Sequence, residues 1–173
     1  MAVPINRIDA ALLISGESEW VNYRDVTWGR MDTPEQPMVV NLVLLLAAPV
    51  DRERFTAMLH DRLLRFARFR QRLVQAGNRY LWLEDPAFNL DDHLDWLRLP
   101  EPADQRTLEE QVGELSSQPL DFNRPLWRCI VLENYGVGGA LVFRIHHGIA
   151  DGVALLRGFR TLTELGRGPA SPP

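Results

Sequence analysis

Two adjacent histidines, His146 and His147, open a seven-residue segment that continues Gly148-Ile149-Ala150-Asp151-Gly152. A neutral imidazole titrates near neutral pH, so it can take a proton from a hydroxyl that attacks a thioester and return it to the leaving thiolate. The alternative is a pair of core histidines satisfied by hydrogen bonds, which is the commoner situation for a lone histidine. The complete seven-residue pattern favours the general base.

A β-strand predicted over residues 139–147 positions the pair, because its side chains alternate between two faces. His147 shares one face with Leu141, Phe143 and Ile145, and His146 shares the other with Ala140, Val142 and Arg144. Two side chains on opposite faces cannot easily bind one ion, and no cysteine or third histidine lies nearby in the sequence, so we expect no metal site.

The glycines and the aspartate of the segment have structural roles. Gly148 and Gly152 leave space for a ligand to approach the backbone. Asp151 either caps the helix that follows or pairs with a buried arginine. Both roles would fix the turn that aims His147.

The composition indicates one globular domain: 173 residues, 46% of them hydrophobic and 24% charged. The net charge of −4 argues against a general nucleic-acid binder. The single cysteine, Cys129, excludes internal disulfides, and its apolar neighbours indicate a buried, inert thiol. The apolar run 38–50 is too short to cross a bilayer, and residues 1–10 lack a signal-peptide pattern, so we expect a cytoplasmic protein, with contact to a membrane surface left open.

Helices are predicted from apolar residues at helical spacing. The predicted helices cover residues 51–66, 104–117 and 151–165, with a short one before Gly16. The stripe of the first comprises Phe55, Met58, Leu59, Leu63 and Phe66. Asp51 is its expected N-cap, and Thr107 with Glu110 could form a capping box in the second.

Strands are predicted over residues 38–46 and 126–133 as well as 139–147, and residues 15–19 are predicted to be a loop. Two further segments, 69–74 and 79–83, bracket a Gly-Asn pair and predict a hairpin. Strands mixed with single helices indicate an α/β or α+β layered domain, with a mixed sheet flanked by helices.

The segment at His146 resembles the His-His-x-x-x-Asp-Gly motif of the chloramphenicol acetyltransferase-like superfamily, which includes peptide-synthetase condensation domains. Three further segments resemble the bacterial wax ester synthase/diacylglycerol acyltransferases within it: Pro-Leu-Asp-Phe-Asn-Arg-Pro-Leu-Trp at 119–127, Phe-Arg-Gln-Arg-Leu at 69–73 and Met-Asp-Thr-Pro-Glu-Gln-Pro-Met at 31–38. The resemblance covers residues 23–165 in the correct order. It implies one half of a two-domain fold: residues 1–22 an N-terminal extension, 23–166 the N-terminal acyltransferase domain, and 167–173 a linker or truncated tail.

The resemblance also implies roles for single residues. It makes His147 the base that deprotonates the acyl acceptor and His146 a less directly involved neighbour. Asp151, followed by Gly152, becomes a structural carboxylate that pairs with Arg70. Arg62 is a competitor for that pairing, because it falls on the apolar stripe of a predicted helix and would need a buried partner. Trp127 is expected in the core rather than against substrate.

The activity implied is transfer of a long-chain acyl group from acyl-CoA, as co-substrate, to a fatty alcohol or diacylglycerol, with no bound cofactor and no covalent enzyme intermediate. Family members carry a second domain, and their reaction tunnel lies between the halves. A C-terminal partner domain, in the same gene product or a separate chain, or a homo-oligomer is therefore expected, and contact with a membrane or lipid inclusions would suit a lipid acceptor. Two alternatives stay open: an isolated half or split subunit without activity of its own, and a condensation-type acyltransferase that uses carrier-protein thioesters.

Overall fold

The computed structural model of the chain describes residues 18–21, 33, 37–76 and 79–149. The predicted helices before Gly16 and over 151–165 lie outside these residues, as do Asp151 and Gly152. Within the described part, no helix has the length and apolar character needed to cross a membrane.

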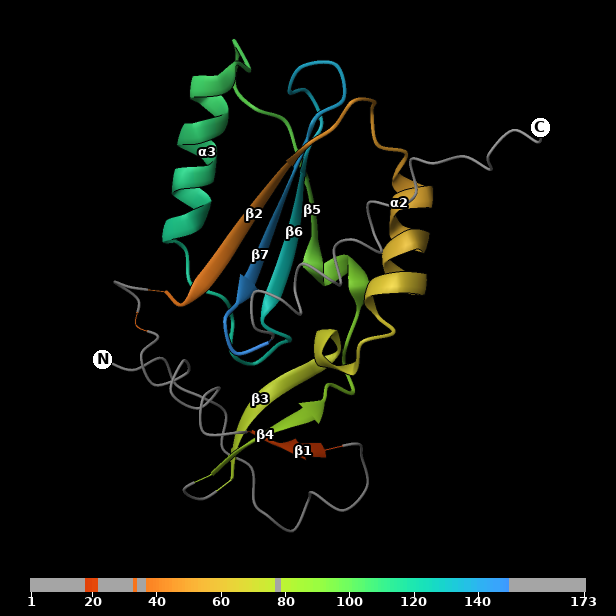
Figure 1. Ribbon diagram of the computed structural model, residues 1–173, viewed down its shortest axis with the longest axis vertical. Coiled ribbons are helices and arrows are strands. Elements are labelled where there is room, and N and C mark those ends of the chain that lie inside the picture. The colour runs from red at the N-terminus through yellow and green to blue at the C-terminus, as the bar shows by residue number, and fades with distance from the viewer. Residues whose placement is uncertain (1–17, 22–32, 34–36, 77–78, 150–173) are drawn as a thin grey trace, which may run out of the picture.

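A four-stranded sheet forms the centre of the described part, in the order β2-β7-β6-β5 (Figure 1). Its strands are β2 (Val39–Leu45), β5 (Leu94–Leu97), β6 (Trp127–Leu132) and β7 (Ala140–His146). β7 runs antiparallel to both β2 and β6, whereas β5 runs parallel to β6. The sheet is mixed, as predicted, but β5 was missed, because a four-residue strand is too short to show a period.

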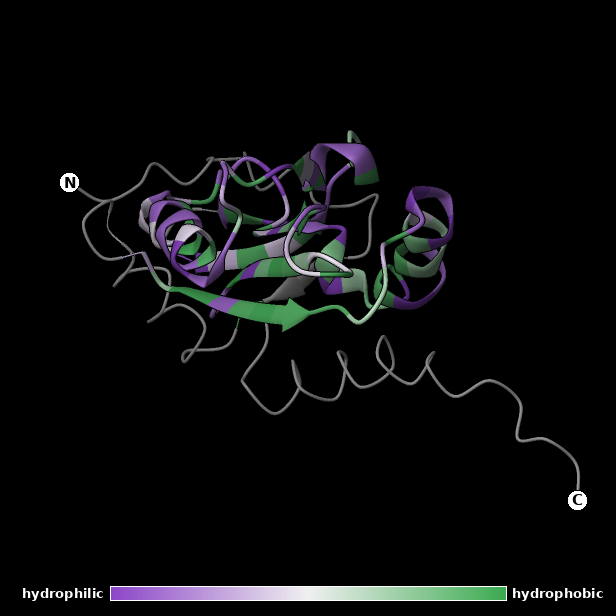
Figure 2. Cartoon of the chain, turned by 90° about the horizontal axis from the view of Figure 1, so that it is seen from above, coloured by the Kyte–Doolittle hydropathy of each residue, from purple (hydrophilic) through white to green (hydrophobic). Residues whose placement is uncertain are grey.

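Two helices cover the two faces of this sheet (Figures 1 and 2). Helix α3 (Gln105–Ser117) lies in the crossover from β5 to β6 and packs Leu108 and Leu115 on one face. Helix α2 (Arg52–Met58) and a π-helical turn (Leu59–Leu63) pack on the other. In Figure 2 the strands between the helices are largely green, and both helices carry purple, as a layered core with solvated outer surfaces requires.

The helix starts were predicted with mixed success. Asp51 caps α2 as expected, accepting a hydrogen bond from the Arg54 N–H at 2.8 Å. The capping box at Thr107 is wrong, because Asp104 is the cap and accepts from both the Thr107 N–H and its hydroxyl at 2.9 Å. The first predicted helix also ends early: Phe66 lies beyond the π-helical turn and is 47% exposed.

A second, three-stranded antiparallel sheet lies beyond the C-terminal end of β7 (Figure 1). Strands β3 (Gln71–Ala76) and β4 (Arg79–Glu84) form the predicted hairpin. Strand β1 (Ser18–Trp20) pairs with β4, which corrects the loop prediction at residues 18 and 19, while residues 15–17 lie outside the described part. Three residues carry no period, and β1 is a strand because β4 offers it hydrogen-bonding partners.

The core between α2, the sheet and the hairpin contains the side chains expected there. Trp127 and Cys129 are both fully buried, which confirms both predictions. Burial raises the pKa of the Cys129 thiol well above its usual value, so this thiol stays protonated and unreactive.

Candidate active site

The end of β7 carries the two motif histidines between two neighbouring segments. The His146 N–H donates to the Leu126 carbonyl oxygen at 3.0 Å, and the His147 N–H donates to the Met38 carbonyl oxygen at 2.8 Å. The backbone of the two histidines is therefore hydrogen-bonded to the segments next to β6 and β2, its two neighbours in the sheet. These bonds hold the histidine backbone in a fixed position.

The alternation predicted for this strand is confirmed. Leu141, Phe143 and Ile145 pack in the core on the α2 side, whereas Ala140 and Val142 pack in the core on the α3 side. The two histidines differ in burial: the His146 side chain is fully buried, and His147, in the turn after the strand, is half-buried. Two residues that look equivalent in the sequence thus have different access to a ligand.

The His146 ring is built into the turn that follows it. The Gly148 N–H donates to His146 Nδ1 at 2.9 Å, and the ring meets Phe122 edge-on with centroids 5.5 Å apart. Because Nδ1 accepts, the proton of the neutral ring is assigned to Nε2. Burial, and secondarily the neighbouring His147, lower the pKa of His146 from 6.5 to about 4. His146 is therefore neutral at pH 7 and serves to hold the turn.

Close packing favours glycine at position 148. A Cβ atom there would lie 3.0 Å from His146 Nδ1 and 3.8 Å from Cζ2 of Trp82, and the Ile149 N–H closes the turn on the His146 carbonyl oxygen at 2.9 Å. The sequence suggested that the missing side chain makes room for a ligand. In the structure that room is taken by the His146 ring and bordered by Trp82, a residue of β4 that no sequence pattern marked.

Arg144 is a second buried residue of this region that no sequence motif marks. It is 2% exposed, two residues before His146, and its guanidinium donates to Asn41 Oδ1 at 3.3 Å and to the Gln118 carbonyl oxygen. Burial, followed by the positive charge of Arg128, lowers its pKa. An arginine inside an otherwise apolar alternating strand was the signal that could have marked it.

The predicted partner of Asp151 is already bound to another carboxylate. Arg70 Nε donates to Glu84 Oε1 at 2.8 Å, and its guanidinium also donates to the Leu64 carbonyl oxygen. Arg62 lies elsewhere, at an open cavity of about 490 Å³ beside α2. Asp151 and Gly152 are outside the described residues, so the Asp151–arginine pairing stays a prediction.

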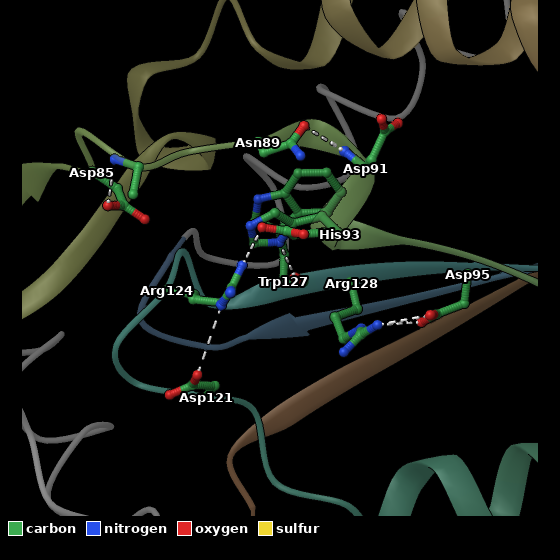
Figure 3. Close-up of polar contacts among 11 residues, drawn as sticks. Asp85, Asn89, Asp91, His93, Asp95, Asp121, Arg124, Trp127 and Arg128 are labelled. Atoms are coloured by element: carbon green, nitrogen blue, oxygen red, sulfur yellow. Dashed lines mark hydrogen bonds and ion pairs between the residues drawn. The ribbon is translucent and has the colours of Figure 1, made fainter.

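The segment that precedes β6 is held by its own contacts. The Trp127 indole N–H donates to the Phe69 carbonyl oxygen at 2.8 Å. The His93 ring stacks on Trp127 with centroids 4.7 Å apart, and its Nδ1 lies 2.8 Å from the Trp127 carbonyl oxygen (Figure 3). Arg124 pairs with Asp92 at 2.5 Å and reaches toward Asp121 at 3.9 Å. These contacts anchor this segment to the core and to the residues around His93.

Comparison with known proteins finds the same architecture. The family model for the wax ester synthase/diacylglycerol acyltransferase catalytic domain matches residues 21–173. The wax ester synthase/diacylglycerol acyltransferase from Marinobacter aquaeolei VT8 superposes with a TM-score of 0.68 at 26% identity, covering 80% of this chain and 37% of that one. The starter condensation domain of rhizomide synthetase RzmA superposes with a TM-score of 0.69 at 16% identity, covering 89% and 41%, and shares the fold. The predicted fold class is confirmed.

Sequence relatives lead to the same group. A Mycobacterium tuberculosis H37Rv protein named for diacylglycerol O-acyltransferase activity is 33% identical over 138 aligned positions, and the match covers 72% of this chain and 27% of that protein. The product of tgs3, named for the same activity in that strain, is 29% identical over 156 aligned positions, and the match covers 86% of this chain and 58% of that protein. The chain thus spans between about a quarter and three fifths of the length of these relatives. It belongs to the wax ester synthase/diacylglycerol acyltransferase family.

Proposed function

We propose that this chain supplies the catalytic base of an O-acyltransferase that moves a long-chain acyl group from acyl-CoA to a fatty alcohol or diacylglycerol. The product is a wax ester or triacylglycerol. His147 is the general base, and His146 and Asp151 hold the turn that carries it.

The contrast between the two histidines is the observation that supports this assignment most directly. A base must be reached by the acceptor hydroxyl and must titrate near the working pH. The His146 ring is fully buried, with Nδ1 occupied by the Gly148 N–H and a pKa of about 4. His147 is half-buried on a turn whose backbone is fixed. The more accessible histidine takes the proton, and the buried one positions it.

The reaction balances with one base. His147 accepts the proton of the acceptor hydroxyl as its oxygen attacks the thioester carbonyl carbon. The new C–O bond forms, the C–S bond breaks, and the proton passes from the imidazolium to the thiolate, which leaves as CoA-SH. No bond to the enzyme forms at any stage.

Related structures support acyl-CoA as the donor. A rhizomide synthetase starter condensation domain of the same fold was solved in complex with C8-CoA. Because the relatives are longer than this chain, we propose that a C-terminal domain, in the same gene product or a separate chain, completes the acyl tunnel; a homo-oligomer is the alternative arrangement. The lipid acceptor would be drawn from a membrane surface or a lipid inclusion that the cytoplasmic protein touches.

A matched pair of histidine variants tests the base. Acceptor-dependent release of CoA thiol is measured for the unmodified chain, His147→Ala and His60→Ala. We expect His147→Ala to lower kcat by about 10²–10⁴-fold without a change in Tm. His60 is far from His147 in the sequence and its side chain is 73% exposed, so His60→Ala should keep normal turnover. Normal turnover in folded His147→Ala protein would show that the base is another group.

The share of the relatives' length that the chain covers favours a second candidate, a binding or structural half that is active only with a partner domain. Its test is turnover as a function of chain concentration, alone and with the C-terminal domain of a relative added. A fully active monomer excludes it. The likeness to condensation domains raises a third candidate, use of carrier-protein thioesters. Parallel assays with acyl-CoA and acyl-carrier protein as donors separate it from the first.

A further inference from the structure

Trp82 and Trp127 are both fully buried, but their indole N–H groups have different surroundings. The Trp127 N–H donates to the Phe69 carbonyl oxygen at 2.8 Å. The Trp82 N–H has no hydrogen-bond partner among the described residues. Because a buried indole N–H normally finds an acceptor, and leaving it unpaired lowers folding stability, the unpaired Trp82 donor calls for a function.

The Trp82 ring borders the turn that carries His147. Its Cζ2 atom is 3.8 Å from the position of a Cβ on Gly148, the residue after His147. Cζ2 and Nε1 are bonded to the same ring carbon. The donor is therefore two bonds from the ring atom that approaches Gly148, and Gly148 directly follows the candidate base.

A cation lies over the same ring. The guanidinium carbon of Arg68 is 4.6 Å from the Trp82 ring centroid, and Arg68 also donates to Gln71 Oε1 at 3.1 Å. A positive charge over the face draws electron density from the indole and strengthens its N–H as a donor. It also makes this location favourable for developing negative charge.

We propose that the Trp82 indole N–H donates a hydrogen bond to the carbonyl oxygen of the acyl thioester bound at the His147 turn. This oxygen gains negative charge when the acceptor hydroxyl attacks, so a donor fixed in a dry environment would stabilise the transition state more than the bound substrate. The inference rests on the proposed function, because it needs a thioester at His147.

The test compares two ligands that differ in this oxygen. The whole chain is labelled with ¹⁵N at its five tryptophan indoles and titrated with octanoyl-CoA or with S-octyl-CoA, a thioether that lacks the carbonyl. We expect the Trp82 N–H resonance to move downfield with octanoyl-CoA alone, and the Trp127 resonance to stay in place with both. Single Trp→Phe variants at the other four positions assign Trp82 by elimination, even if Trp82→Phe fails to fold.

Trp→Phe variants test the same hydrogen bond through ligand affinity and turnover. Trp82→Phe should weaken octanoyl-CoA binding by about 10-fold and leave S-octyl-CoA binding unchanged. It should lower kcat by about 10²-fold, more than it raises KM. The control, Trp127→Phe, should leave the ratio of the two affinities unchanged.

The outcomes separate this inference from the proposed function. Octanoyl-CoA that binds without moving Trp82, or S-octyl-CoA that moves it equally, overturns the role of Trp82 and leaves His147 as the base. If the Trp82 resonance moves but the His147→Ala variant keeps full turnover, His147 is not the general base, and the role of Trp82 as a donor stands. Absence of octanoyl-CoA binding overturns the inference outright.

Discussion

Two clusters in the described part each combine a buried histidine with a buried tryptophan, and they are arranged in opposite ways. At the start of β6, His93 Nδ1 lies 2.8 Å from the Trp127 carbonyl oxygen, so this nitrogen carries the proton. At the end of β7, His146 Nδ1 accepts from the Gly148 N–H, so the other ring nitrogen carries it. A backbone carbonyl selects one tautomer and a backbone N–H selects the other.

The difference shows how the same residue types serve as scaffold or as site. His93 is stacked between Phe88 and Trp127, at centroid distances of 5.3 and 4.7 Å, and the Trp127 N–H is satisfied. His93 keeps one buried acceptor, Nε2, without a partner among the described residues, but it is enclosed by aromatic rings. At the β7 end Trp82 has a buried N–H donor without a hydrogen-bond partner among the described residues, and its ring borders the turn that carries the half-buried His147. The His93–Trp127 cluster stabilises the fold, and the His146–Trp82 cluster keeps a hydrogen-bond donor that a ligand could use.

The largest effect expected from the comparison is loss of stability in acid. The folded-state pKa of His146 is about 4 and that of His93 is also lowered, against 6.5 in the unfolded chain. Below pH 6.5 the unfolded chain therefore binds more protons, and the free energy of unfolding falls as the pH falls toward 4. His146 alone contributes about 3 kcal/mol to this decrease, and above pH 6.5 its contribution to stability is complete.

Urea unfolding at pH 7, 6, 5 and 4 measures this decrease, with His146→Gln and His93→Gln as variants. Burial, followed by the positive charges of Arg128 and Arg124, lowers the pKa of His93. The hydrogen bond to the Trp127 carbonyl and the charge of Asp92 raise it. We expect the His146 variant to flatten the pH dependence more than the His93 variant. If the free energy of unfolding depends on pH equally in all three chains, the two histidines do not differ in how their protonation affects stability.

A smaller effect distinguishes the two tryptophans. Trp127→Phe deletes a satisfied hydrogen bond and leaves a buried carbonyl unpaired, so it should lower the free energy of unfolding by about 2 kcal/mol. Trp82→Phe deletes a donor that has no partner among the described residues and loses only ring volume, so it should cost about 1 kcal/mol. Urea unfolding at pH 7 compares them. A larger cost at Trp82 would show that its N–H is engaged in the free protein.

The smallest effect concerns the turn itself. In Gly148→Ala the new methyl meets the His146 ring at 3.0 Å, so the ring must shift. We expect a loss of about 1 kcal/mol in stability and about 10-fold in turnover, because the shift moves the backbone next to His147. Gly113→Ala is the matched control. It lies in α3 with nothing within 4 Å of the new atom, so it should stabilise the chain by about 0.5–1 kcal/mol and leave turnover unchanged.

Features that depend on residues close together along the chain were predicted well. The alternation of β7, the β3–β4 hairpin and the Asp51 cap all follow from patterns of a few residues. Short strands were not predictable in this way. β1 and β5, of three and four residues, are strands because β4 and β6 lie beside them. The misplaced cap at Thr107 shows the remaining limit, since Asp104 is an equally good local cap.

By itself the sequence determined the motif, the strand that carries it and the family to which the chain belongs. The tertiary structure decided which histidine is buried, which carboxylate Arg70 binds and which tryptophan keeps an unpaired N–H. The physical reason is that burial and choice of partner arise where distant segments meet, as Trp82 of β4 meets Gly148 after β7. A local sequence pattern cannot predict such a contact, because the contact does not depend on the residues that neighbour Trp82 or Gly148 in the chain.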